Sequence, residues 1–116
     1  MIGLDAPHVA HQDNQLGVCL QWRALSRVKQ RYTTFVHVLG SGLEPAPQAD
    51  VQPPYPTDLW AKGETVEQCM TLAVAGLPDQ GWFLAIGMYD STTLQRLPVR
   101  QRGGDLLPDN AITVVP

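Results

Sequence analysis

Alternation of apolar and polar residues with a period of two is the feature that most constrains this chain. Residues 16–23 show it most clearly, because every second side chain there is apolar: Leu16, Val18, Leu20 and Trp22. Successive side chains of a β-strand point to opposite faces of a sheet, so this pattern predicts a strand with one face against a core. One such strand cannot bury its apolar face alone, and the chain must supply others.

The same alternation recurs along the sequence. Further strands are predicted at residues 32–39, 65–74 and 82–89, shorter ones at 94–99 and 111–115, and an edge strand is a candidate within residues 2–10. The segment 32–39 is apolar, aromatic or β-branched on both faces, which indicates a central strand covered on both sides. In the segment 65–74, Gln68 interrupts the apolar face.

Turn-forming residues separate these segments at 40–42, 77–81, 90–92 and 103–105. Short strands between such turns are typical of sandwiches or barrels rather than βαβ units. We therefore expect residues 1–116 to form one all-β domain, a two-sheet antiparallel β-sandwich of about seven or eight strands, immunoglobulin-like or jelly-roll in shape. Its predicted core consists of Leu16, Val18, Leu20, Trp22, Val36, Val38, Leu72, Leu84, Ile86 and Met88, together with Trp82.

Composition and charge argue against several classes of protein. Apolar residues make up 44% of the sequence and charged residues 16%, the balance of a folded protein. The net charge of −3 and the scattered Lys and Arg residues argue against a nucleic-acid partner. No apolar segment approaches the roughly 20 residues that span a bilayer, and the N-terminus lacks a signal-peptide pattern. We therefore expect no membrane contact by the chain itself, and a cytoplasmic location if it is free-standing.

The two cysteines, Cys19 and Cys69, both fall inside predicted strands. Because the sequence has no CxxC pair and no Cys/His cluster, it does not match the usual structural zinc patterns. A disulfide needs a specific geometry that the sequence does not reveal. Two partly buried free thiols are therefore the preferred interpretation, with a disulfide as the alternative.

Residues 43–62 differ from the rest of the chain because they hold half of its prolines. These are Pro45, Pro47, Pro53, Pro54 and Pro56. Proline fixes the backbone angle φ, so this segment is predicted to be a stiff crossover loop that packs against the sandwich. Tyr55 and Trp60 lie within it.

A spaced set of residues, rather than any single motif, resembles a known family. The set comprises Trp22, the run YTTFVHVL at 32–39, residues 48–50, Pro54, Pro56 with Thr57, Trp60, residues 63–66, residues 87–90, and Arg96 with Leu97. Over roughly residues 16–98 the chain resembles the C-terminal β-sandwich domain that follows the membrane-spanning part of bacterial glycosyltransferase-like proteins of the dolichyl-phosphate-mannose mannosyltransferase type. The first stretch departs from this pattern, since His8, His11 and Gln12 stand where an apolar strand is expected.

The resemblance implies a non-catalytic, extracytoplasmic accessory module beside a lipid-linked sugar transferase. Catalysis in such proteins belongs to the membrane part. The resemblance assigns no functional residue and no cofactor to this domain. An extracytoplasmic location is expected if the chain belongs to such a parent protein.

Aromatic residues give the strongest indication of a binding surface. Sugar rings present apolar C–H faces that stack on flat side chains, and their hydroxyls need polar partners nearby. Tyr55 and Trp60 are predicted to form such a platform, with Gln48 and Asp50 beside them. The alternative for Trp60 is that it closes one end of the sandwich.

A second candidate surface is a shallow trough on one predicted strand, where Ala85 and Gly87 alternate with Phe83 and Tyr89. The alternative is that Gly87 permits the close approach of another part of the backbone. His37 has two interpretations. It is either a partly buried side chain with a satisfied hydrogen bond, or a polar group in a ligand cleft under the proline-rich segment.

Catalytic and metal-binding patterns are weak. The sequence has no GxSxG motif, and its three histidines have no recognisable catalytic partner, so we expect no enzyme and no cofactor. The side chains considered as calcium ligands are Gln48, Asp50, Asp58 and Glu64. Their spacing matches no calcium loop, and capping of turns is the preferred role. His8 and His11 are a weak metal pair at most, and solvation is preferred.

The predicted function is a non-catalytic accessory module of a glycosyltransferase-like protein that binds glycan. Its candidate contacts are Tyr55, Trp60, Gln48, Asp50 and His37. The alternative is a protein-interaction or assembly domain, which would pair with a protein partner or a second copy through a sheet edge or the trough.

Overall fold

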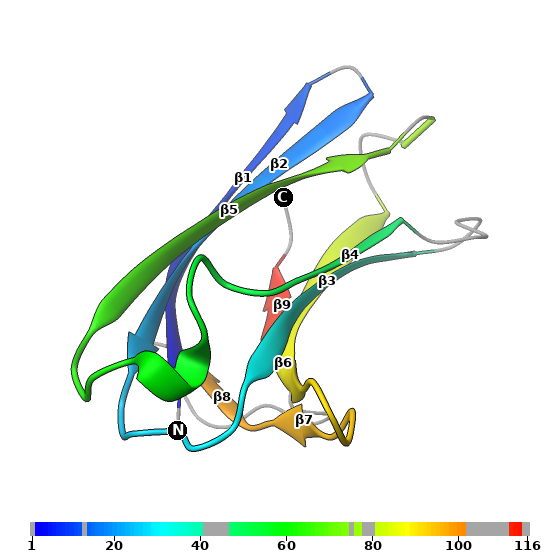
Figure 1. Cartoon of the computed structure of the whole chain (residues 1–116). Coiled ribbons are helices and arrows are strands. Elements are labelled where there is room, and N and C mark those ends of the chain that lie inside the picture. The colour runs from blue at the N-terminus through cyan, green and yellow to red at the C-terminus, as the bar shows by residue number, and fades with distance from the viewer. Residues whose placement is uncertain are drawn as a thin grey trace.

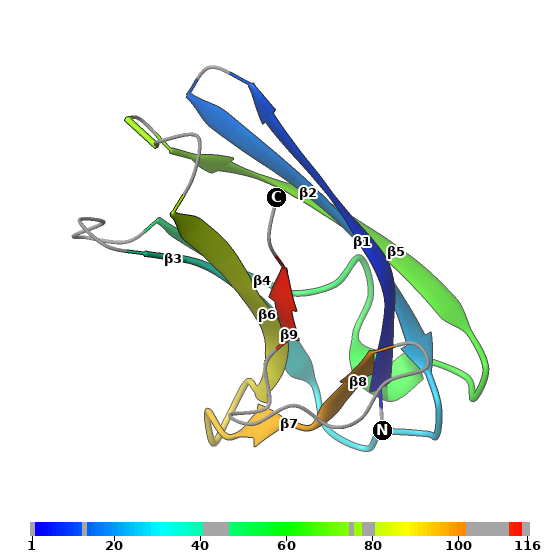
Figure 2. The ribbon, with the colours of Figure 1, turned by 180° about the vertical axis from the view of Figure 1, so that it is seen from behind.

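The chain forms two β-sheets that lie face to face, as the opposite views of Figures 1 and 2 show. The computed structural model describes residues 2–12, 14–40, 47–74, 76–77, 81–101 and 112–114. Within these ranges lie β1 (Ile2–Gln12), β2 (Gln15–Ala24), β3 (Tyr32–Gly40), β4 (Gln48–Val51), the 3₁₀ helix η1 (Thr57–Leu59), β5 (Thr65–Ala73), β6 (Trp82–Asp90), β7 (Arg96–Leu97), β8 (Val99–Gln101) and β9 (Ile112–Val114). The predicted all-β sandwich is confirmed, with somewhat more strands than expected.

The first sheet has the strand order β5-β2-β1-β8, and the second has the order β4-β3-β6-β7, with β9 also paired to β6. β1, β2 and β5 therefore lie in one sheet, and β3, β4 and β6 lie in the other. The described strand pairs are antiparallel as expected, apart from β1 and β8, which run parallel. This pair forms because the chain leaves the second sheet after β7 and enters the first at β8.

Side chains from both sheets meet in one hydrophobic core. The inward positions of β2, β3 and β6 alternate along each strand, as a period of two requires. Every residue predicted for the core is buried there, including Trp22 and Trp82. The face assignments made from alternation are therefore confirmed.

Strand β1 is longer and more central than the edge strand expected near the N-terminus. It runs to Gln12 and lies between β2 and β8, with Ile2 and Leu4 fully buried. The pairing register with β2 shifts between Asp5 and His8, which is a β-bulge or similar irregularity. Bulges bend a strand and re-aim its side chains, which accounts for the change in burial pattern along β1.

The short strand expected at residues 94–99 is divided in two by Pro98. β7 belongs to the second sheet and β8 to the first. Proline has no N–H to donate to a ladder, so it favours the point where the chain changes sheets. Of the strand expected at 111–115, β9 is described and pairs with β6. The turn expected at 103–105 lies outside the described residues, as do residues 41–42 and 78–80 of two other turns.

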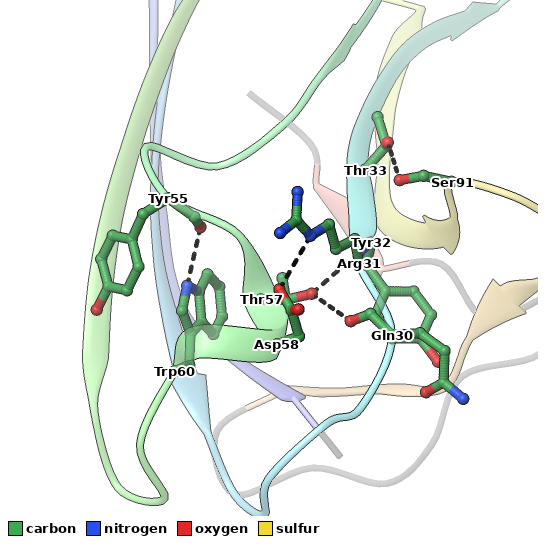
Figure 3. A network of polar contacts seen from close by, with 9 residues as sticks. All are labelled: Gln30, Arg31, Tyr32, Thr33, Tyr55, Thr57, Asp58, Trp60 and Ser91. Atoms are coloured by element: carbon green, nitrogen blue, oxygen red, sulfur yellow. Dashed lines mark hydrogen bonds and ion pairs between the residues drawn. The ribbon is translucent and has the colours of Figure 1, made fainter.

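The proline-rich segment is not a structureless loop over its described part. It contains β4 and η1, whereas residues 43–46 lie outside the described residues. Figure 3 shows how η1 is fixed to the start of β3: Oγ1 of Thr57 donates to the carbonyl of Gln30 at 2.8 Å and accepts from the amide of Tyr32 at 3.0 Å. Thr57, which is fully buried, attaches the segment to β3.

Gln68, which interrupts the apolar alternation of β5, is buried and joins the two sheets. Its Oε1 accepts hydrogen bonds from Nε1 of Trp22 at 3.0 Å and from Oγ1 of Thr34 on the opposite sheet at 2.6 Å. Its Nε2 donates to the carbonyls of Val51 at 3.2 Å and Gln52 at 3.1 Å. A buried amide is costly unless it is paired, and here both ends of the side chain have partners.

Cys19 and Cys69 form a disulfide, so the preference for two free thiols is wrong. The two residues are direct partners in the antiparallel register of β2 and β5. Because Trp22 and its inward neighbours alternate with Cys19, the bond lies on the outer face of the first sheet. The register between strands distant in the sequence decides this pairing, and alternation within each strand does not reveal it.

Candidate functional site

A pocket of about 270 Å³ opens on the outer face of the second sheet. It is lined by Phe35, His37, Asp50, Tyr89, Leu94 and Arg96. Alternation explains why these side chains meet. Thr34, Val36 and Val38 of β3 point into the core, so Phe35 and His37 point outward, and Tyr89 does the same on β6. Asp50 faces Phe35 across the β3–β4 pair, and Arg96 faces Tyr89 across the β6–β7 pair.

Phe35 forms the floor of the pocket. It is 1% exposed although it lies on the outer face, because other pocket side chains cover it. The guanidinium carbon of Arg96 lies 4.4 Å from the centre of the Phe35 ring, a cation–π contact. The ring of Tyr89 stacks on Phe35 at 6.3 Å, and the imidazole of His37 lies 5.1 Å away.

Asp50 is the polar centre of the pocket. Its Oδ2 accepts a hydrogen bond from the Tyr89 hydroxyl at 3.3 Å, and its Oδ1 lies 3.6 Å from Nε2 of His37. Burial and then the negative charge of Asp50 raise the pKa of the Tyr89 hydroxyl above its ordinary value. Because the Asp50 side chain is 40% exposed, it keeps acceptor sites free for a ligand.

The rim of the pocket is a turn of five residues, 91–95, that joins β6 to β7. The Asp90 carboxylate accepts from the backbone amides of Thr92 at 2.7 Å and Thr93 at 3.1 Å, which fixes the turn. The amide of Leu94 donates to the carbonyl of Asp90 at 2.8 Å. Leu94 then has φ of 65°, the left-handed region that glycine or asparagine adopts at least cost. For a leucine this conformation costs about 1–2 kcal/mol.

The core amide of Gln68 positions the polar side of the pocket. β4 is a four-residue edge strand, and Asp50 is its third residue. The amide group of Gln68 holds the carbonyls of Val51 and Gln52, the two residues that follow Asp50. The residue that breaks the alternation of β5 therefore also anchors the end of the strand that carries Asp50.

Of the predicted site residues, the structure brings His37 and Asp50 together in this pocket. Gln48 faces His37 on the neighbouring strand but does not line the pocket. Trp60 is fully buried in the core, and its Nε1 donates to the carbonyl of Tyr55 at 3.1 Å (Figure 3). The expected Tyr55–Trp60 platform is therefore not formed: Tyr55 packs at an angle against the edge of an indole that closes the sandwich.

The trough expected on β6 is filled. Phe35 is the register partner of Gly87 and packs with Ala85 and Tyr89 in a small cluster on the outer face. Tyr89 lines the pocket, whereas Phe83 does not.

The structure does not gather the residues considered for metal binding. Among the described residues, no three His, Cys, Asp or Glu side chains lie close enough together to hold a metal ion. His11 packs edge-on against Trp82 with ring centres 6.0 Å apart, and His8 is exposed. Asp58 pairs with Nε of Arg31 at 3.3 Å, and Glu64 accepts from the amide of Ala61 at 2.9 Å, a turn-capping role.

Three pocket residues have no counterpart in the sequence prediction: Phe35, Leu94 and Arg96. Phe35 and Arg96 are recognisable only once the register of β3, β6 and β7 is known. Leu94 carries a signal in the sequence, because a leucine ends a polar turn that begins with Asp90. An exposed leucine at a turn position suited to glycine indicates a role outside folding.

Comparison with protein-family models, with curated proteins and with solved structures finds no match for this chain. Within the described part of the chain, no helix has the length and apolar character needed to cross a membrane.

Proposed function

We propose that this domain is a non-catalytic accessory module that binds carbohydrate in the pocket on the outer face of the second sheet. One observation carries the proposal: aromatic, carboxylate, imidazole and guanidinium groups all line a single pocket of about 270 Å³. That volume is at the small end of ligand pockets, which suits one ring of a sugar rather than a larger ligand.

The chemistry of the lining residues matches that of a sugar. A sugar ring needs an apolar surface for its C–H face, and the half-buried ring of Tyr89 offers one. Its hydroxyls need both acceptors and donors. Asp50 accepts, and His37 and Arg96 carry N–H groups that donate. Aromatic residues lose little conformational entropy on binding, because they have only two side-chain torsions.

A binding role is favoured over catalysis by what the pocket contains. Asp50 Oδ1 and His37 Nε2 lie 3.6 Å apart, which is longer than the roughly 2.6–3.2 Å hydrogen bond that orients the base in a catalytic triad. A triad also needs a nucleophile, and the described residues that line the pocket include no serine, threonine or cysteine.

The association with a glycosyltransferase-like parent protein is supported by the resemblance of residues 16–98 to the C-terminal domain of such proteins. The Cys19–Cys69 disulfide supports the extracytoplasmic location that goes with it, since disulfides persist in oxidising compartments and are rare in the cytosol.

The test is an amide NMR titration of the protein with mono- and oligosaccharides, with and without calcium. We expect shifts at Asp50, His37 and Tyr89, and their loss in Asp50→Ala. Glu67→Ala is the control, because Glu67 is an exposed carboxylate on β5 of the other sheet. A flat response to every sugar would rule out carbohydrate binding by this pocket.

Assembly through a sheet edge is the second candidate, and one observation favours it. β5 is a nine-residue strand at the end of the first sheet and pairs, among the described strands, with β2 alone. An edge of this length can add a strand from a second copy. Sedimentation at increasing protein concentration distinguishes the two, since a rising mass supports assembly.

A further inference from the structure

Leu94 combines two features that a fold does not need at the same position. Its side chain is 68% exposed, and its backbone has φ of 65°. Glycine or asparagine would end the same turn with less strain and without apolar exposure. Strained backbone conformations cluster at functional sites, and the positive φ of Leu94 is such a conformation at the rim of the pocket.

The strand order places Asp50 and His37 on one side of the pocket, and Leu94 on the other side together with Arg96 of β7. Asp50 stands on β4 and His37 on β3, whereas Leu94 lies in the turn between β6 and β7 at the other side of the same sheet. A ligand that spans the pocket would therefore place hydroxyls toward Asp50 and an apolar group toward Leu94.

We propose that Leu94 is a specificity-determining residue, and that the preferred ligand is a sugar that carries a methyl group. This inference rests on the carbohydrate-binding function proposed above. The methyl group belongs either to a 6-deoxy sugar or to an N-acetyl sugar, and in both cases an aliphatic side chain is its natural partner. Unsubstituted hexoses present a hydroxyl at the corresponding position, which leucine cannot pair.

The experiment compares sugars that differ in this group, using amide NMR titration of the whole chain. The pairs are L-fucose with L-galactose, L-rhamnose with L-mannose, and N-acetyl-D-glucosamine with N-formyl-D-glucosamine. Within the first two pairs, the methyl-bearing member is expected to bind roughly four- to tenfold more tightly if the methyl group is that of a 6-deoxy sugar, as burial of one methyl group predicts. If it is that of an N-acetyl sugar, the same gain is expected for N-acetyl-D-glucosamine over N-formyl-D-glucosamine, which lacks only the methyl group. The first two pairs test the 6-deoxy source of the methyl group and the third tests the N-acetyl source.

Leu94→Asn is the informative variant, because asparagine tolerates the left-handed backbone and the domain should stay folded. It should remove the preference, so that the two sugars of a pair bind with about equal affinity. Leu59→Asn is the matched control: Leu59 is 61% exposed, lies in η1, and does not line the pocket.

The outcomes separate the two proposals. Equal binding within every pair, or a preference that survives Leu94→Asn, overturns the role of Leu94 and leaves carbohydrate binding intact. If no sugar of any pair shifts the resonances of Asp50, His37 and Tyr89, the carbohydrate function falls and this inference falls with it.

Discussion

Oγ1 of Thr34 donates a hydrogen bond to Oε1 of Gln68 at 2.6 Å, and this contact joins the two sheets inside the core. Gln68→Leu would leave the Thr34 hydroxyl and the Trp22 indole N–H without this acceptor. We expect a loss of about 3–5 kcal/mol in the free energy of unfolding, since each buried orphaned group costs about 1–3 kcal/mol. Urea unfolding measures it.

The matching control is the double variant Thr34→Val, Gln68→Leu. It removes both partners of the inter-sheet bond, so it should cost less than the sum of the two single variants. Additive losses would show that the two side chains stabilise the domain independently.

Alkaline pH should destabilise the domain through Tyr89. Its folded-state pKa is raised by burial and by Asp50, so the unfolded chain loses this proton first. Stability is therefore full below the ordinary tyrosine pKa of about 10 and declines as the pH rises from there through the higher folded pKa. Tyr89→Phe should flatten this decline.

Tyr32 also contributes, because burial and Asp90 raise its pKa in the same direction. The comparison therefore needs Tyr32→Phe alone and with Tyr89→Phe, each followed by urea unfolding at neutral and alkaline pH. Tyrosinate absorbance checks the cause: in Asp50→Asn the titration of Tyr89 should move to lower pH. An unchanged titration would show that Asp50 does not raise the pKa of Tyr89.

Removal of the disulfide should destabilise the domain mainly through the unfolded chain. Cys19 and Cys69 are 50 residues apart. In the chain-entropy model, closing a loop of this length lowers the entropy of the unfolded state, which raises its free energy by about 4 kcal/mol at 25 °C. The variant Cys19→Ala, Cys69→Ala should lose roughly 2–4 kcal/mol in urea unfolding while its amide spectrum keeps the native pattern around the pocket. A loss of native shifts at Phe35 or Tyr89 would instead show a structural role in the second sheet.

Trp60→Ala should cost about 3–5 kcal/mol, as truncation of a buried aromatic residue does. Trp22→Ala and Trp82→Ala should lose similar amounts, because both indoles lie in the same core. Tyr55→Ala is the informative comparison, since Tyr55 is only half-buried and packs against the core from outside. A loss under about 1 kcal/mol for Trp60→Ala would contradict its burial.

Residues within a strand were predictable, and contacts between strands were not. Leu16, Trp22 and Ile86 belong to the core because a period of two fixes the face of each side chain once a strand exists. The Cys19–Cys69 bond depends on the register of two strands far apart in the sequence, and a shift of one residue would have separated the sulfurs.

The candidate site shows the same division. His37 was predicted within a strand and Asp50 within the proline-rich loop, and the structure places both in one pocket. The sequence left two roles open for Trp60, a binding platform or closure of one end of the sandwich. The structure shows Trp60 buried in the core, next to the 3₁₀ helix η1 that Thr57 attaches to the start of β3. Arg96 contacts Phe35 because β7 pairs with β6. A strand of two residues is too short for its pairing to be predicted from the sequence.

The disulfide also sets how the domain responds to mechanical tension. When the chain is pulled from its ends, the covalent path of the force runs from β2 to β5 through the Cys19–Cys69 bond and bypasses the backbone between them, which contains β3, β4 and η1. The 50 residues of sequence separation correspond to about 170 Å of extended chain that stays unavailable to stretching until the bond is reduced. Asp50 and His37 both lie on this stretch of backbone, which the force cannot extend while the bond is intact.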